Sequence, residues 1–324
     1  MNKLFRKHLG IPCSATPNDG NSKVTSERFV LIYLDDIIIF SKNREDHATH
    51  LEKVLKILDE ADLHISYRKC NFERTELRFL GHIVGNEGIK VDPTKTKVIQ
   101  EWPIPTNITA VRSFCGLMNY FRRFIQGYSS MIAPLTNLTK QNVPFDWTPE
   151  CQQAFDMAKA ALTKAPVLAM PDFNNPTDME IICDASIRGI GAVLTQSGRP
   201  IAFESKKLTQ TERNWSTGDQ ELWAVIHALK TFRWAVEGLQ FKVITDHNPN
   251  THLQTNPNLS RRQARWAEYM QRFNFTWEYR PGRTNVADPL SRHPEFTLNM
   301  MSHSNHQEWK QTTHSKTSSS QSER

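Results

Sequence analysis

The sequence predicts a mixed α/β (α+β) protein, and two observations carry this prediction. First, the second half of the chain alternates short apolar, β-rich runs with segments whose apolar residues recur at helical spacing. Second, 38% of the 324 residues are hydrophobic, which is enough for packed cores. The length also exceeds the ~100 to 200 residues usual for one domain. We therefore expect sheets covered by helices, in more than one domain.

Charge and cysteine content narrow the class of protein. The net charge of +6 suits a polyanionic partner such as nucleic acid. The five cysteines form no CxxC pair, which argues against a zinc ribbon or a disulfide framework. The basic N-terminus lacks the apolar region of a secretory signal, and no apolar run approaches the ~18 residues of a membrane span. We expect an intracellular protein, cytoplasmic or nuclear, that is not secreted and has no membrane partner.

The first quarter of the chain predicts an irregular segment, a hairpin and a helix. Polar, turn-forming residues fill 11–27, where we expect an insert without regular structure. Two β-rich runs, 29–33 and 37–40, then predict a hairpin with acids at its turn. Apolar residues at helical spacing predict an amphipathic helix over 47–63. The acids at the turn are Asp35 and Asp36.

The middle of the chain predicts a second hairpin followed by helices. Residues 78–91 hold two β-rich runs around a Gly-Asn-Glu-Gly turn. An Asp-Pro pair at 92–93 supplies the cap and the first-turn proline of a helix. The apolar face of a helix over 108–125 is most simply core. Prolines mark 134–176 as a connecting region with one short helix at 149–162.

The second half predicts a run of strands and two longer helices. The helices cover 216–236 and 260–273, and the second has a core-facing aromatic stripe of Trp266, Tyr269 and Phe273. The end of the chain is polar with almost no apolar residues, so we expect disorder there. The strands cover 179–183, 191–196, 200–208, 241–245 and 275–279.

Two acidic residues follow apolar strands. Asp184 ends the strand at 179–183, and Asp246 ends the strand at 241–245. A buried carboxylate is unfavourable unless it is paired or binds a metal, so each acid needs a reason to be there. If the two strands are neighbours in the sheet, the acids come together.

Two further acids lie near helix starts. Glu221 faces inward, because it shares a helical stripe with Val225, Ala228 and Phe232. Asp288 lies at a helix start that Asn285 can cap. If these helices cross the strand ends, four carboxylates converge and repel one another unless divalent cations lie between them. Oxygen ligands alone suit Mg²⁺ or Mn²⁺. Two such ions ~3.5 to 4 Å apart support phosphodiester hydrolysis.

Taken one at a time, these acids have simpler explanations. Asp184 and Asp246 could be turn residues at strand ends. Glu221 and Asp288 could be helix N-terminal charges favoured by the helix dipole. Their joint order and surroundings favour the metal site.

Four motifs resemble the RNase H domain of gypsy-type LTR retrotransposon Pol polyproteins, in the order and spacing of that family. The resemblance implies a five-stranded mixed sheet with flanking helices. It also implies that two Mg²⁺ (or Mn²⁺) ions are bound by Asp184, Glu221, Asp246 and Asp288. The motifs are ICDAS (182–186), GDQELWAVIHALKTFR (218–233), VITDHNP (243–249) and YRPGRTNVADPLSR (279–292).

The first half resembles the reverse transcriptase of the same polyproteins. FVLIYLDDIIIFS (29–41) resembles the palm hairpin, with Asp35 and Asp36 as polymerase acids. Later segments resemble the thumb and the connection. The family's fingers and a further palm aspartate precede these motifs, so we expect a truncated polymerase that is inactive alone. The implied division is 1–27 (remnant and irregular insert), 28–92 (C-terminal part of the palm), 93–176 (thumb and connection), 177–294 (RNase H-like domain) and 295–324 (disordered tail).

The predicted function is cleavage of RNA paired to DNA. Its partners would be the RNA–DNA hybrid and other Pol products of the element. The alternative is a non-catalytic nucleic-acid-binding remnant of a decayed element, and the four intact acids favour the enzyme. Several arginines could follow the phosphates of the hybrid, or could form only a solvated face. They are Arg261, Arg262, Arg265, Arg280 and Arg283.

Overall fold

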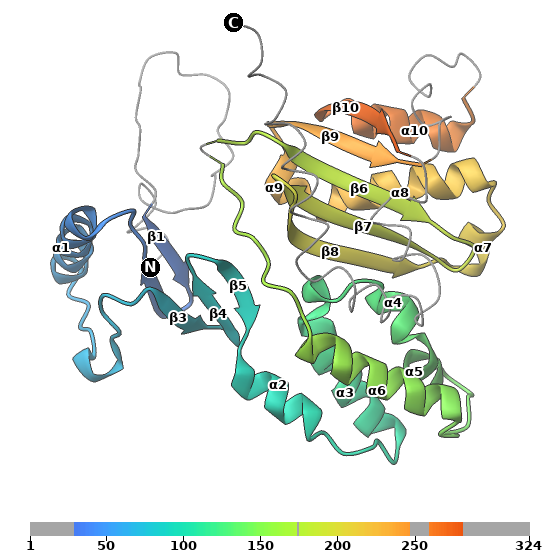
Figure 1. Ribbon diagram of the computed structural model, residues 1–324, viewed down its shortest axis with the longest axis horizontal. Coiled ribbons are helices and arrows are strands. Elements are labelled where there is room, and N and C mark those ends of the chain that lie inside the picture. Colours follow the sequence, from blue (N-terminus) through green and yellow to red (C-terminus); the bar gives the residue numbers. More distant parts are fainter. Residues whose placement is uncertain (1–28, 174, 247–258, 281–324) are drawn as a thin grey trace, which may run out of the picture. The chain divides into compact units, whose positions relative to one another are not determined.

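The computed structural model describes residues 29–173, 175–246 and 259–280, which form two compact units, 1–73 and 74–324 (Figure 1). The predicted insert and tail lie outside the described residues, as do Asp288 and Arg283. The finer division of the chain into five segments stays a prediction.

The first unit contains the predicted hairpin and helix. Strands β1 (Val30–Tyr33) and β2 (Asp36–Ile39) pair antiparallel, and helix α1 (Arg44–Glu60) follows. The helix begins three residues before the predicted start because the Asn43 side chain accepts a hydrogen bond from the backbone N–H of Asp46 and caps it. A short 3-10 turn, η1 (Tyr67–Lys69), lies further on. The core of this unit consists of Phe29, Val30, Ile32, Val54 and Leu58.

The second unit begins with three strands where the sequence predicted two. Strands β3 (Glu76–Phe79), β4 (His82–Gly85) and β5 (Gly88–Val91) form an antiparallel meander. The apolar run that was expected to be a single strand is interrupted by Leu80 and Gly81. Both residues have positive φ, 48° and 74°, as a tight two-residue hairpin turn requires.

Helices follow the meander. Helix α2 (Pro93–Gln100) is capped by Asp92, whose side chain accepts from Thr94 N–H, as predicted. The helix predicted over 108–125 is shorter. Helix α3 (Ile108–Tyr120) ends at Tyr120, and the 3-10 turn η2 (Arg122–Phe124) follows it. The tighter turn still buries Phe121 and Phe124, so the predicted core face is confirmed. The region then contains α4 (Tyr128–Met131), α5 (Ala133–Leu138) and α6 (Pro149–Thr163).

The predicted five-stranded mixed sheet is confirmed. Its strands stand in the order β10-β9-β6-β7-β8, with β6, β7 and β8 antiparallel and with β9 parallel to both β6 and β10 (Figure 1). The bounds are β6 (Met179–Ala185), β7 (Gly189–Gln196), β8 (Arg199–Lys207), β9 (Gln240–Thr245) and β10 (Asn274–Tyr279).

Helices cover the sheet, and one of them differs from the prediction. The helix expected over 216–236 is two helices, α8 (Thr217–Thr231) and α9 (Arg233–Val236), which meet at the buried Phe232. The short α7 (Gln210–Arg213) precedes them, and α10 (Arg261–Met270) lies between β9 and β10. Trp266 and Phe273 are buried and Tyr269 packs against the same core, so the predicted aromatic stripe is confirmed.

Both faces of the sheet are packed. Ile181 and Val243 belong to the core that includes residues of α8 and α10. Their neighbours Ile182 and Ile244 belong to the core that includes residues of α3, α5 and α6. Since successive side chains of a strand point to opposite faces, both faces of the central strands are buried. This double cover fixes the strand ends from which the candidate site is built.

Candidate functional site

The two strand-end acids lie side by side. Strands β6 and β9 are parallel neighbours, with Ile182 opposite Ile244. Two residues beyond each member of this pair lies an acid: Asp184 in β6 and Asp246 directly after β9. The sequence prediction that neighbouring strands bring these acids together is confirmed. Asp184 is only 2% exposed, so its carboxylate lies within the fold.

The third acid comes from the helix that covers this sheet. Glu221 lies in the early turns of α8, whose N-cap Ser216 accepts a hydrogen bond from Asp219 N–H at 3.2 Å. Glu221 is buried, and so are Val225, Ala228 and Phe232 on the same stripe, so the predicted inward face is confirmed. The helix therefore brings Glu221 from outside the sheet to the ends of two strands.

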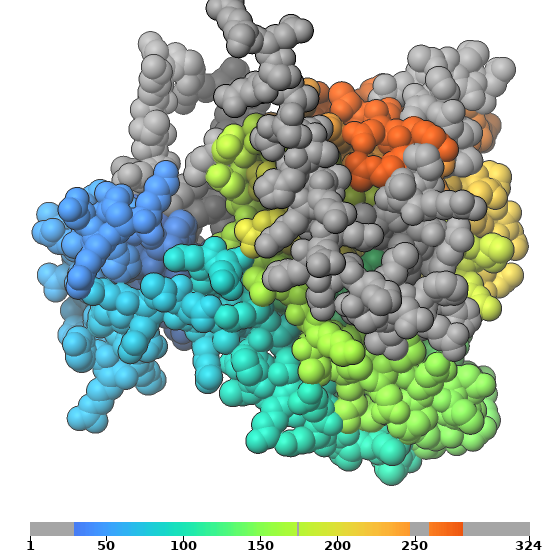
Figure 2. Space-filling view, in the orientation of Figure 1, coloured from blue at the N-terminus to red at the C-terminus, as the bar shows by residue number. Residues whose placement is uncertain are grey.

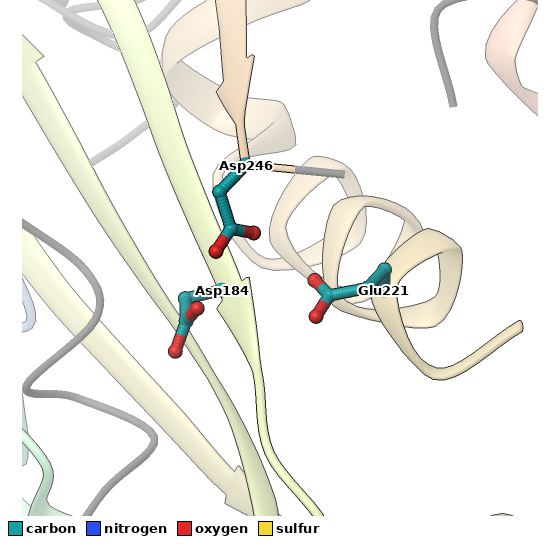
Figure 3. Close-up of side chains that lie close together, drawn as sticks. All are labelled: Asp184, Glu221 and Asp246. Atoms are coloured by element: carbon teal, nitrogen blue, oxygen red, sulfur yellow. The ribbon is translucent and has the colours of Figure 1, made fainter. Parts of the chain in front are cut away.

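The three side chains form one cluster. One carboxylate oxygen from each of Asp184, Glu221 and Asp246 lies within 4.8 Å of the other two (Figure 3). Strand β6 supplies Asp184, helix α8 supplies Glu221 and the residue directly after β9 is Asp246, so the side chains gather at the end of β9. The carboxylates also act on a neighbouring thiol. Burial is the main cause that raises the pKa of Cys183, and the charges of Glu221 and Asp184 raise it further.

The donor set fits a hard divalent cation. All three side chains offer carboxylate oxygens, and among the residues that the structure describes no nitrogen or sulfur ligand belongs to this cluster. Carboxylates held this close in a largely buried site repel one another, and a cation with several oxygen ligands removes the repulsion. Oxygen donors favour Mg²⁺ or Mn²⁺ over zinc.

The other predicted site residues are spread over the described parts. Asp35 and Asp36 are exposed at the β1–β2 hairpin and belong to no cluster of three metal-ligating side chains among the residues that the structure describes. Arg261 and Arg265 are exposed on α10. Arg280 lies 3.0 Å from Glu278.

Arg262 has partners that the sequence did not indicate. Its guanidinium lies 2.9 Å from the buried carboxylate of Asp219 and 4.1 Å from the centre of the Trp215 ring. Asp219 and Arg262 are 43 residues apart, so helical spacing gave no sign of this contact. The one available signal was an acid two residues before Glu221 on the same helix.

In the space-filling view, the orange segment that ends the described chain forms part of the visible outer surface (Figure 2). This segment contains α10 and β10. Among the described helices, none has both the length and the apolar character required to cross a membrane.

Two family models match the chain. Residues 1–84 match the reverse transcriptase (RNA-dependent DNA polymerase) model, and residues 172–273 match the RNase H-like domain found in reverse transcriptase. The second match contains the whole three-carboxylate cluster.

Solved structures of a viral enzyme are similar in fold. The foamy viral protease-reverse transcriptase in complex with RNA/DNA hybrid is 27% identical, with a TM-score of 0.68 over 77% of this chain and 35% of that chain. A form of it described as dRH, in complex with double-stranded DNA, is also 27% identical, with a TM-score of 0.69 over 78% of this chain and 46% of that chain.

Curated relatives are retrotransposon polyproteins. The Pol polyprotein from transposon gypsy of Drosophila melanogaster is 38% identical over 81% of this chain and 26% of its own length. That from transposon opus of the same organism is 38% identical over 93% of this chain and 30% of its own length. The chain thus spans about a quarter to a third of these relatives. It belongs to the retrotransposon Pol polyprotein family, with a reverse transcriptase segment followed by an RNase H-like domain.

Proposed function

We propose that the RNase H-like domain hydrolyses the RNA strand of RNA–DNA hybrids, using two Mg²⁺ (or Mn²⁺) ions. The observation that carries the proposal is the cluster of Asp184, Glu221 and Asp246, in which three separate elements bring carboxylate oxygens within 4.8 Å of one another. Asp288 completes the proposed ligand set and lies outside the described residues. Retaining three buried or half-buried carboxylates at one point is unfavourable unless cations bind there.

The chain's own part in this chemistry is to hold the ligands still. When bound, the two ions would activate a water molecule and stabilise the leaving oxygen of an in-line phosphodiester displacement. Strands β6 and β9 fix Asp184 and Asp246 through their shared ladder. Helix α8 fixes Glu221 through its packing on the sheet. A preorganised set of ligands avoids reorganisation during the reaction.

The proposed substrate follows from the neighbours and from charge. One similar viral structure is a complex with RNA/DNA hybrid, and others are complexes with double-stranded DNA. Arg261, Arg265 and Arg280 lie on the segment that contains α10 and β10, where they would contact phosphates. Recognition would depend on duplex shape and 2′-hydroxyls, so sequence preference should be weak.

For the reverse transcriptase segment, we propose Asp35 and Asp36 as acids of the polymerase palm. Both are exposed, and among the described residues they have no third metal-ligating side chain beside them. Two exposed carboxylates hold divalent ions weakly. We therefore propose hydrolysis, and not DNA synthesis, as the activity of this chain by itself.

The test is cleavage of an end-labelled RNA–DNA hybrid by the purified chain with Mg²⁺. Asp184→Asn and Glu221→Gln should each abolish detectable cleavage, because each removes a charged metal ligand. Glu180→Gln is the matched control, since it replaces a carboxylate by an amide on β6, the strand that carries Asp184, outside the cluster. It should cut like the wild type. A folded wild type that binds the hybrid without cutting it would instead support the non-catalytic remnant.

A further inference from the structure

The early part of α8 carries three consecutive buried polar residues. Asp219, Gln220 and Glu221 are each 7% exposed. The proposed metal site uses only Glu221. The other two contact neighbouring elements: Asp219 contacts α10, and Gln220 contacts the end of α7.

Asp219 joins α8 to the start of α10. Its Oδ2 accepts a hydrogen bond from Arg262 Nη2 at 2.9 Å, and its Oδ1 accepts one from Gln263 Nε2, also at 2.9 Å. Both oxygens of this carboxylate are therefore occupied by the first turn of α10. Asp219 is not a member of the acidic cluster, although it lies only two residues from Glu221.

Arg262 is itself held by aromatic rings. Its guanidinium carbon lies 4.1 Å from the ring centre of Trp215 and 5.7 Å from that of Trp266. The two indole rings are in contact, with centres 5.6 Å apart. A planar guanidinium on an aromatic face loses little freedom when it also binds a carboxylate. The arginine therefore presents its charge to Asp219 in one orientation.

The position of Arg262 in its own helix supports this role. It lies in the first turn of α10, which also contains Arg261 and has no acid. The helix dipole disfavours cations at that end, whereas it favours Asp219 in the first turn of α8. The ion pair with Asp219 offsets the unfavourable position of Arg262 and satisfies a buried charge.

Gln220 joins α8 to the segment that precedes it. Its Nε2 donates to the backbone oxygens of Arg213 at 2.9 Å and of Glu212 and Trp215 at 3.2 Å each. These carbonyls lie at and beyond the C-terminal end of α7. The turn of α8 that carries Glu221 is thus bound both to the end of α7 and to the start of α10.

We propose that Arg262 is a positioning residue of the metal site, which acts through Asp219 to hold Glu221 against Asp184 and Asp246. This inference rests on the proposed metal-dependent nuclease. Mutation of residues that support metal ligands typically costs about 10- to 100-fold in metal affinity or activity. Arg262 is thereby separated from the predicted phosphate-contacting arginines, whose side chains would act on the nucleic acid directly.

The test compares metal dependence with hybrid affinity in Arg262→Ala. The Mg²⁺ concentration for half-maximal cleavage, and that for half-maximal thermal stabilisation of the chain without nucleic acid, should both rise about tenfold. Affinity for the hybrid measured in EDTA should stay close to that of the wild type. A phosphate contact would show the reverse, with weaker binding and a salt slope reduced by about one.

Two variants control the experiment. Arg272→Ala removes an arginine that likewise pairs with an acid, Glu237 at 3.3 Å, and lies 5.7 Å from the centre of an aromatic ring, Tyr269. It should leave the Mg²⁺ dependence unchanged. Arg262→Lys keeps a charge for Asp219 without the planar stack, so its Mg²⁺ requirement should fall between those of the wild type and Arg262→Ala.

The outcomes separate this inference from the proposed function. An unchanged Mg²⁺ dependence in folded Arg262→Ala overturns the positioning role even if the wild type is active. A wild type that is stabilised by Mg²⁺ but does not cut the hybrid overturns the proposed nuclease activity. The thermal measurement then still tests the positioning role of Arg262. A wild type with neither response overturns both. If Arg262→Ala fails to fold, Arg262→Lys and Gln263→Ala are judged by the same criterion.

Discussion

At the scale of single residues, the fold places carboxylates in buried or half-buried positions, where a charge is energetically unfavourable. Asp184 lies within a strand, Glu221 lies on the buried stripe of α8, and Asp246 follows the last residue of β9. Apolar runs that stop at an acid made Asp184 and Asp246 predictable from the sequence, and the inward helical stripe made Glu221 predictable. The support for Glu221 was not predictable, because Asp219 meets Arg262 only through the packing of two helices.

His82 is another residue whose charge is constrained by its surroundings. Its ring lies 5.4 Å from that of Tyr120 and 5.3 Å from that of Phe124, centre to centre. Burial, and then the positive charge of Arg123, lower the pKa of His82 from its ordinary value of 6.5. The unfolded chain therefore binds a proton at this position at a higher pH than the folded chain does.

This difference predicts a loss of stability in acid. As the pH falls below 6.5 towards the lowered pKa of the folded state, protonation favours the unfolded chain. His82→Phe, which keeps an aromatic ring, should reduce the fall in Tm between about pH 7 and about pH 5, the range in which histidine titrates. Thermal unfolding followed by circular dichroism measures it. Substitution of the exposed His64 by Phe is the control, and an equal effect of both variants would contradict the assignment to His82.

At the scale of elements, a connecting segment ties the meander to the large sheet. Leu168 exchanges backbone hydrogen bonds of 2.8 and 2.9 Å with Ile89 of β5, and Ala169 N–H donates to Pro200 O of β8 at 2.7 Å. The prolines predicted a connection here, and its pairing with two strands was not predictable. Local patterns likewise gave the strands and helices but missed the turn at Leu80 and Gly81, where an apolar residue adopts a positive φ.

Gly88 makes this connection possible. It has a φ of +131°, and a Cβ atom there would lie 2.0 Å from the carbonyl oxygen of Leu168. Gly88→Ala should therefore lower the free energy of unfolding by well over ~1 kcal/mol, because backbone must move. Gly116→Ala is the matched control: its Cβ meets nothing within 4 Å, and Gly116 lies inside α3. It should raise stability by about 0.5 to 1 kcal/mol. Urea unfolding of both variants measures this, and equal effects would contradict the account of Gly88.

At the scale of the whole molecule, the balance of charge favours a polyanion. The net charge is +6, while the proposed catalytic cluster is itself acidic. Phosphates would therefore be drawn to the proposed arginines of the α10–β10 segment and would approach the acids only with cations bound there. The resemblance gave the order of the two enzyme segments, which the family models confirm. Sequence alone could not show how the helices cover both faces of the sheet, since this depends on contacts between distant segments.

This view predicts how salt affects binding of the hybrid. The logarithm of the affinity should fall linearly with the logarithm of the salt concentration, because phosphates release counterions when arginines bind them. Arg261→Ala and Arg265→Ala should each reduce the slope by about one. Fluorescence anisotropy with a labelled hybrid at several salt concentrations measures the slope. Slopes identical to that of the wild type would exclude these two side chains from the phosphate contacts.

The central claim is that Asp184, Glu221 and Asp246 bind the divalent ions of a nuclease. Crystals of the chain grown with Mn²⁺ and an RNA–DNA hybrid would test it most directly, through the anomalous scattering of manganese. The account predicts anomalous peaks at coordination distance from the oxygens of all three side chains, with a backbone phosphate beside them. A hybrid bound elsewhere, or a phosphate at this cluster without a manganese peak, would contradict it.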